Sequence, residues 1–162
     1  MTLESYDFLE NLQFLGSEDI SLTGNGSDNV LTGGGGDNYL FGGEGNDELY
    51  GGTSADMLQG GVGADFLVGG SGSDTFVFGD GDGFYDNEFA DTWDDIVFDY
   101  NDSDDFFDLS GVAAAFDIND LSITEYTDDF FGDGVEIGYG TGSFFVVGLS
   151  AGDVNEGDFI FF

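Results

Sequence analysis

Residues 24–77 read GNGSDNVLT, GGGGDNYLF, GGEGNDELY, GGTSADMLQ, GGVGADFLV and GGSGSDTFV, six successive copies of one nine-residue pattern. Glycines recur at the first, second and fourth positions, Asp or Asn stands at the sixth, and a large apolar residue stands at the eighth. Self-similarity at a fixed period indicates a repeat architecture in which each unit packs against its neighbours. A linker has no reason to keep an apolar residue at every eighth position, so this stretch is predicted to be a folded array.

The pattern resembles GGxGxDxUx, the calcium-binding nonapeptide of RTX (repeats-in-toxin) proteins. The resemblance implies an all-β fold, a parallel β-roll (a right-handed β-helix of nonapeptide repeats) whose turns bind Ca²⁺. Within each copy only the last three residues alternate polar and apolar, so they are expected to form a short strand and the first six a turn. The eighth-position side chains are expected to stack inside one narrow core: Leu31, Leu40, Leu49, Leu58, Leu67 and Phe76.

The turns are the candidate calcium sites. Paired glycines permit positive φ and let carbonyl oxygens crowd together where a Cβ would obstruct them. The sixth-position Asp or Asn adds a side-chain oxygen, and Ca²⁺ prefers such mixed oxygen ligands. The predicted metal-site residues are Asn29, Gly34, Gly36, Asn38, Gly43, Gly45, Asp47, Gly52, Asp56, Gly61, Gly63, Asp65, Gly70, Gly72 and Asp74.

Two successive copies are expected to form one coil, so that each site lies between copy n and copy n+2. Six copies allow four such pairings, which predicts four or more bound ions. The first two copies carry Asn29 and Asn38 where later copies carry Asp, which predicts weaker sites near the N-terminus. Ser27 and Ser54 replace Gly at the fourth position and are expected to strain their turns.

The charge is entirely of one sign: 35 acidic residues and no Lys, Arg or His give a formal net charge of −35. Such a chain repels itself, yet it is 40% hydrophobic and 17% aromatic, unlike a disordered tail. The two features agree if the compact state requires an external cation, so we expect the chain to unfold in the low calcium of a cell and to fold outside it. Nucleic acid is excluded as a partner because no basic residue can hold phosphates, and an anionic membrane surface is disfavoured for the same reason.

Several other classes of site and segment are excluded. Without Cys or His there are no disulfides and no zinc sites of the Cys or His type. The first residues, MTLESYD, lack the positive start and apolar core of a secretory signal peptide, and no run is long enough for a membrane helix. Without His, Cys, Lys or Arg, nucleophile triads and Schiff bases are excluded, so we expect no enzyme activity.

Three zones are expected along the chain. Residues 1–23 form an N-terminal degenerate coil or cap, residues 24–77 form the six-repeat roll, and residues 78–162 form a Phe-rich β cap with a terminal secretion signal. Strands are predicted at residues 12–15, 20–23, 95–98, 121–124, 135–137, 143–147 and 159–161, and one helical turn at residues 110–116.

The segment after the repeats also resembles RTX proteins, here those exported by type I secretion. The matching stretches are DTFVF at residues 74–78, DIVFDY at 95–100 and DFFDLS at 105–110. Two readings of Asp95, Asp99 and Asp108 stand open: a further calcium site or a solvated acidic face. The C-terminus resembles an uncleaved secretion signal, Asp158, Phe159, Ile160, Phe161 and Phe162, and an ordinary closing strand is the alternative.

Two functions follow from these patterns. The first is a secreted, extracellular calcium-binding RTX module that folds on extracellular calcium and serves bacterial type I export without an N-terminal signal peptide. The second is a free-standing structural protein that assembles end to end with itself into calcium-dependent filaments, a surface layer or biofilm matrix. The initial Met and the lack of a catalytic domain favour a complete protein and thereby raise the second. An intracellular calcium buffer is disfavoured, because weak sites would stay empty there.

Overall fold

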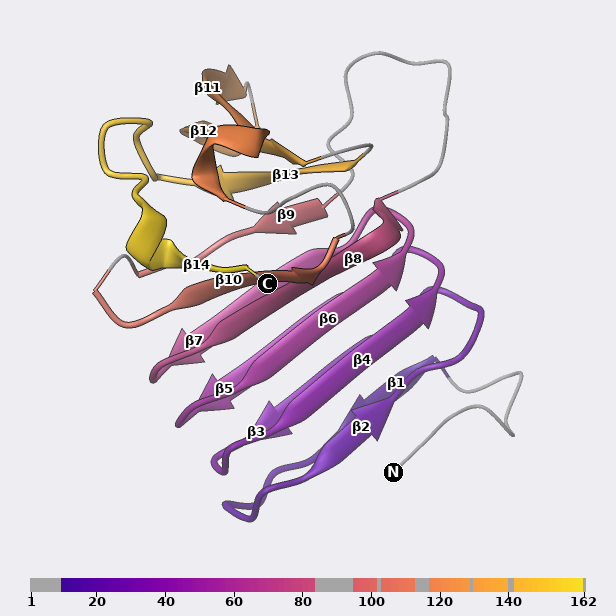
Figure 1. The fold of residues 1–162 in the computed structure, drawn as a ribbon. Coiled ribbons are helices and arrows are strands. Elements are labelled where there is room, and N and C mark those ends of the chain that lie inside the picture. Colours follow the sequence, from indigo (N-terminus) through magenta and orange to yellow (C-terminus); the bar gives the residue numbers. More distant parts are fainter. Residues whose placement is uncertain are drawn as a thin grey trace.

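The computed structural model describes residues 10–83, 95–101, 103–112, 117–128, 130–139 and 142–161. This part contains fourteen strands and two short 3₁₀ helices, and no α-helix. Most strand pairs are parallel, and the repeats form two sheets that face each other (Figure 1). The predicted all-β fold with a parallel β-roll is confirmed.

Each repeat contributes one strand, and successive strands alternate between the two sheets. The strands are β3 (Val30–Gly34), β4 (Tyr39–Glu44), β5 (Glu48–Thr53), β6 (Met57–Val62), β7 (Phe66–Ser71) and β8 (Thr75–Gly83). Parallel pairing joins each residue to the one eighteen positions later, as in Leu31 with Leu49 and Leu40 with Leu58. One coil therefore consists of two nonapeptides, as predicted.

The strands are longer than the predicted triplets. β4, β5, β6 and β7 continue through both glycines of the next copy and end at its third position. The paired glycines extend the strands because a residue without a side chain lets the neighbouring coil approach closely enough to pair, as Gly43 pairs with Gly61. The turn is correspondingly shorter and consists of the fourth to sixth positions.

The core is the predicted stack of eighth-position side chains, and it continues beyond the repeats. Leu31, Leu40, Leu49, Leu58, Leu67 and Phe76 are all fully buried. Towards the N-terminus the stack ends at Leu12 on β1 (Asn11–Gln13) and Leu22 on β2 (Ser21–Thr23). Towards the C-terminus it continues with Val97 on β9 (Asp95–Val97) and Phe107 on β10 (Phe106–Gly111).

The C-terminal region closes the roll. Phe159 on β14 (Phe159–Ile160) pairs with Phe107, and β13 (Gly142–Val147) pairs with β9. An antiparallel pair, β11 (Leu121–Asp128) and β12 (Gly132–Tyr139), extends the sheet that contains β7 and β9 beyond β13 (Figure 1). The helices η1 (Ile118–Asp120) and η2 (Glu156–Asp158) precede β11 and β14. All predicted strands are present, whereas residues 113–116 of the predicted helical turn lie outside the described residues and Ser110 and Gly111 belong to β10.

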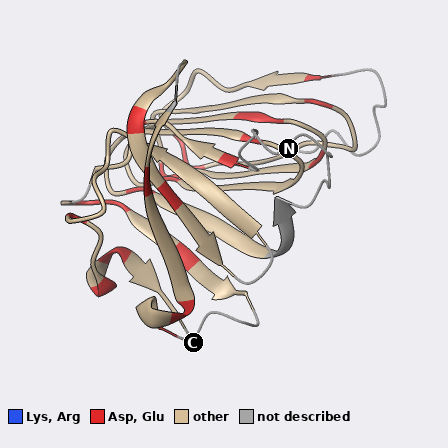
Figure 2. Cartoon of the chain, turned by 90° about the horizontal axis from the view of Figure 1, so that it is seen from above, with Lys and Arg blue, Asp and Glu red and all other residues tan. Residues whose placement is uncertain are grey.

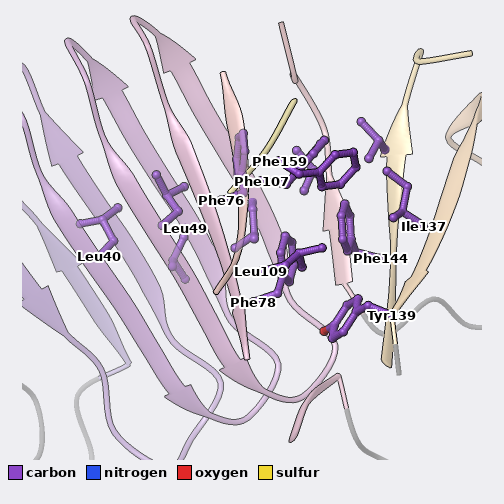
Figure 3. Close-up of a cluster of buried hydrophobic side chains, with 14 of the residues drawn as sticks. Leu40, Leu49, Phe76, Phe78, Phe107, Leu109, Ile137, Tyr139, Phe144 and Phe159 are labelled. Carbon is purple, nitrogen blue, oxygen red and sulfur yellow. The ribbon is translucent and has the colours of Figure 1, made fainter. Parts of the chain in front are cut away.

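Aromatic rings fill the end of the roll. Phe78 stacks on Phe144 with ring centroids 4.1 Å apart, and Tyr100 stacks on Phe107 at 4.3 Å. Figure 3 shows that the cluster runs from the leucines of the roll through Phe107 to the cap. Burying a Phe side chain stabilises a fold by about 1.5–3 kcal/mol. The aromatic cluster therefore stabilises the end of the roll that the leucine stack leaves open.

Candidate metal centres

The sixth-position side chains form two ladders, one along each turn edge of the roll. In the first, the amide N–H of each member donates to Oδ1 of the next, at 2.7 Å from Asn29 to Asp47, 2.8 Å from Asp47 to Asp65 and 3.0 Å from Asp65 to Asp95. The second ladder repeats this arrangement through Asn38, Asp56, Asp74 and Asp105 at 2.8 to 2.9 Å. One oxygen of each acceptor carboxylate thus links two coils.

The other oxygen of two of these carboxylates has no hydrogen-bond donor. Oδ2 of Asp47 and Oδ2 of Asp56 are buried without a partner, on side chains that expose only 1% and 2% of their surface. Burial raises the pKa of Asp47 to about 7 and that of Asp56 to about 6, although hydrogen bonds from Asn29 and Asn38 lower them in part. A buried carboxylate oxygen without a donor is costly, and a bound cation would remove that cost.

Backbone carbonyl oxygens lie close to these carboxylates. A Cβ added to Gly51 would lie 2.5 Å from Asp56 Oδ2 and 2.6 Å from the Gly69 carbonyl oxygen. A Cβ on Gly43 would lie 2.5 Å from the carbonyl oxygen of Asn25, in the preceding coil of the same edge. The same crowding recurs at Gly52, Gly61 and Gly70. The turns therefore gather oxygen atoms in spaces that no side chain can enter, which suits a hard cation.

Positive φ at the fourth position separates the first two turns from the other four. The second-position glycines Gly34, Gly43, Gly52, Gly61 and Gly70 all have positive φ. At the fourth position, Gly45, Gly63 and Gly72 share it with Ser54, whose φ is +81°.

The fourth positions of the first two copies, Ser27 and Gly36, are outside this region. Strain is therefore present at Ser54, as predicted, and absent at Ser27.

A second set of side-chain bonds follows the fifth position, which the sequence patterns above do not single out. Oδ1 of Asp28 accepts from the amide of Asn46 at 2.8 Å, and Oδ1 of Asp37 accepts from Ala55 at 3.1 Å. These side chains are exposed at the turn tips. In each of the first two copies, Asp therefore stands at the fifth position, outside the buried ladder, and Asn stands at the sixth. The sequence signal for this arrangement is the neighbouring pair Asp28–Asn29, in which Asp directly precedes the Asn of the sixth position.

The ladders extend into the C-terminal region through Asp95 and Asp105. Asp95 was among the predicted site residues, whereas Asp105 was not. Its signal is the spacing of residues 105–109, DFFDL, which repeats that of residues 74–78, DTFVF. Burial raises the pKa of Asp105 while amides of Asp74 and Asn101 lower it.

The structure does not bring Asp95, Asp99 and Asp108 together. Asp99 accepts from the amides of Gly69 and Gly70 at 2.9 and 2.8 Å, and Asp108 accepts from the amide of Ser110 at 2.9 Å. Across the described residues, no three His, Cys, Asp or Glu side chains form a group suited to a metal ion. Backbone carbonyls must therefore supply much of any site.

The last residues form a strand and its cap. The carboxylate of Asp158 accepts from the backbone and side-chain nitrogens of Asn155, and Phe159 is buried in the core. Ile160 is 41% exposed and Phe161 is partly buried against the core. Phe162 lies outside the described residues.

All charged side chains of the protein are acidic. Figure 2 shows acidic residues and no basic ones on the ribbon. The sequence profile of the RTX calcium-binding nonapeptide repeat (4 copies) matches residues 21–49 and 50–85. These residues are RTX repeats. Residues 21–85 thus carry RTX calcium-binding nonapeptide repeats, and they fold as a β-roll.

Solved structures similar to this chain include two subunits of the Azotobacter vinelandii mannuronan C5-epimerase. AlgE6R3 has 24% identity, a TM-score of 0.49 and coverage of 94% of this chain and 83% of its own. AlgE6R2 has 22% identity, a TM-score of 0.44 and coverage of 93% and 92%. No curated protein matches the sequence. No helix in the described residues is long and apolar enough to span a membrane.

Proposed function

We propose that calcium ions bind along both turn edges of the RTX roll, each between two coils related by eighteen residues. The ligands are turn carbonyl oxygens together with the second oxygen of the ladder carboxylates. The observation that carries this assignment is the buried, donor-free Oδ2 of Asp47 and of Asp56 beside the glycine turns. The predicted glycines Gly34, Gly43, Gly45, Gly52, Gly61, Gly63, Gly70 and Gly72 support the sites through their positive φ.

Calcium then acts as a folding switch. The chain has a net charge of −35 and no internal cation, and its most buried carboxylates lie in line along the two edges. At an extracellular-type Kd of ~10⁻⁴ M, millimolar calcium stabilises the fold by roughly 1.4–2.7 kcal/mol per site. Four such sites supply about 6–11 kcal/mol, which is comparable to the whole stability of a small domain. At cytosolic calcium this contribution vanishes.

This switch suits a secreted protein that is exported unfolded and folds in the extracellular medium. We assign the C-terminal residues 158–162 to recognition by a type I secretion system before folding. The burial of Asp158 and Phe159 is compatible with that role, because β14 can pair only once β10 is formed. Deleting these five residues from a secreting strain should abolish export, and undiminished export would remove the assignment.

Self-assembly is the second candidate, and one structural feature favours it. Among the described residues, β1 and β2 are the terminal strands of their sheets, next to an apolar cavity of about 340 Å³ lined by Leu12, Phe14, Ile20 and Leu22. Unpaired strand edges promote association. Sedimentation in calcium should show oligomers if this end stacks on another molecule, and a monomer at all concentrations would reject it.

A calcium titration followed by circular dichroism tests the folding switch. We expect a β-sheet signal with calcium and a mostly unfolded spectrum with chelator, while magnesium at equal concentration should give little folding because it demands a tighter octahedral site. Identical spectra with chelator and with calcium would overturn the proposal. We assign no catalytic role to the chain, because the lack of Lys, Arg, His and Cys excludes Ser–His and Cys–His pairs and Schiff-base chemistry.

A further inference from the structure

An aromatic groove lies on the outer face of the sheet that contains β5, β7 and β9. It has a volume of about 650 Å³ and is lined chiefly by Tyr50, Phe66, Phe98, Phe130 and Phe131, with Glu48 among its polar residues. These are not core residues of the roll. Tyr50 and Phe66 occupy the ninth and seventh repeat positions, which flank the inward eighth position and therefore face outward.

The rings form a concave surface rather than a flat stack. Phe66 is tilted against Tyr50 by 58° at 6.3 Å and against Phe98 by 44° at 5.5 Å. Across the groove, Phe131 lies 6.5 Å from Phe66, and Phe130 meets Phe131 edge-on at 81°. Phe98 is 46% exposed and Phe130 is 87% exposed, so ring surface remains accessible to a ligand.

Three features make the groove electrostatically negative. The faces of aromatic rings carry negative charge density. The Glu48 carboxylate lies beside them, and its Oε2 accepts from the Tyr50 hydroxyl at 2.8 Å. The whole chain adds a charge of −35 without a single Lys, Arg or His, so an anionic ligand finds no counter-charge anywhere.

We propose that this groove binds a small quaternary ammonium ion of the choline class. Several tilted rings with a carboxylate nearby are the arrangement that recognises such cations through cation–π attraction. Calcium does not compete on equal terms, since it requires several oxygen ligands and the groove is lined mainly by carbon. The field of the protein further concentrates cations near the groove. The rings project outward from the sheet while the ladders follow its turn edges, and the ladder residue Asp65 borders the groove beside Phe66.

The test uses the full chain in millimolar calcium, with choline as the probe in calorimetric titration. The matched ligand is 3,3-dimethylbutan-1-ol, which has the same shape with carbon in place of the charged nitrogen. We expect choline to bind and the neutral isostere to bind about tenfold more weakly or not at all. Equal binding of the two ligands would overturn the proposal, as would no detectable binding of choline.

Variants locate the site. Tyr50→Leu and Phe66→Leu should each weaken choline binding about three- to tenfold, and Glu48→Gln should weaken it without removing a ring. Phe41→Leu is the matched control, because Phe41 occupies the same repeat position as Tyr50 but belongs to the other sheet. Far-UV circular dichroism checks that each variant folds in calcium. If Phe66→Leu does not fold, Glu48→Gln still tests the site.

Two further results would contradict the assignment. If Phe41→Leu weakens choline binding as much as Tyr50→Leu, the binding is not at this groove. If a neutral glucan oligosaccharide binds at Tyr50 and Phe66 while choline does not, the groove is a sugar site. A failure of choline binding with intact calcium-dependent folding leaves the calcium function standing, so the two proposals fail independently.

Discussion

Asp56 and Asp74, eighteen residues apart, are joined by a hydrogen bond of 2.9 Å from the Asp56 amide to Oδ1 of Asp74. Asp56 uses its own Oδ1 in the same way to accept from Asn38 at 2.8 Å, while its Oδ2 is buried without a donor. Asp56 therefore has one carboxylate oxygen that links two coils and one that we assign to a cation. This division makes the calcium-free and calcium-loaded states respond differently to the same substitution.

Replacing the Asp56 carboxylate by an amide should have opposite effects in the two states. Asp56→Asn removes a buried charge, so the calcium-free protein should gain stability. The calcium-loaded protein should lose about 1–3 kcal/mol, because a charged ligand is lost. The folded fraction in chelator, from the β-sheet signal in circular dichroism, and urea unfolding in calcium measure the two effects, and Glu156→Gln, which removes one exposed charge at η2, is the control. A loss of equal size in both states would contradict the ligand role of Asp56.

Acidification should stabilise the calcium-free protein. The pKa values of Asp47, at about 7, and of Asp56 and Asp74, at about 6, are raised by burial above the ordinary value for Asp. A carboxyl with a raised folded pKa binds its proton more tightly in the folded state. Its stabilising effect is therefore complete below about pH 4 and is lost as the pH rises through 6 to 7.

The β-sheet signal of the calcium-free protein in circular dichroism, followed from pH 8 to pH 4, measures this effect as a rise in the folded fraction. Calcium affinity should move the other way and fall as the pH drops below about 7, since protons compete for the same carboxylates. A calcium-free stability that rises with pH over this range would show that these carboxylates are ionised in the folded state.

A methyl group at Gly61 should disrupt the roll more than its backbone conformation explains. Gly61 has φ +106°, and its Cβ would collide with the carbonyl oxygen of Gly43. Gly132 has φ +92° with nothing within 4 Å of its Cβ, so it is the matched control. Gly132→Ala should cost about 1–2 kcal/mol from conformation alone. Gly61→Ala should lower the free energy of unfolding by at least about 1 kcal/mol more and should also weaken calcium binding. Equal losses in the two variants would show that the collision with the Gly43 carbonyl oxygen has no effect.

Removing the side chain of Ser54 should stabilise the roll. Its φ of +81° is costly for a residue with a Cβ, so Ser54→Gly should gain about 1 kcal/mol, reduced by loss of the hydrogen bond from Oγ to the Gly35 carbonyl. Ser27→Gly, at the same repeat position without positive φ, should be neutral or destabilising. Thermal midpoints in calcium compare the two, and a stabilisation by both would show that φ is not the cause.

The sequence by itself determined the roll. A nine-residue period with glycine, Asp or Asn, and an apolar residue at fixed positions, together with its resemblance to the RTX nonapeptide, predicted the coil of eighteen residues and the leucine stack, and it predicts calcium-binding turns. The single sign of charge predicts dependence on a cation, which the calcium titration tests.

Only the tertiary structure decided where the array ends and how its carboxylates are used. The ladders extend to Asp95 and Asp105 because β9 and β10 pair in register with β7 and β8. Asp99 instead binds the backbone amides of Gly69 and Gly70. The aromatic groove joins residues of β5 and β7 to the β11–β12 connection, far apart in the chain. Such relationships arise from strand register and long-range packing, which a repeat of nine residues does not encode.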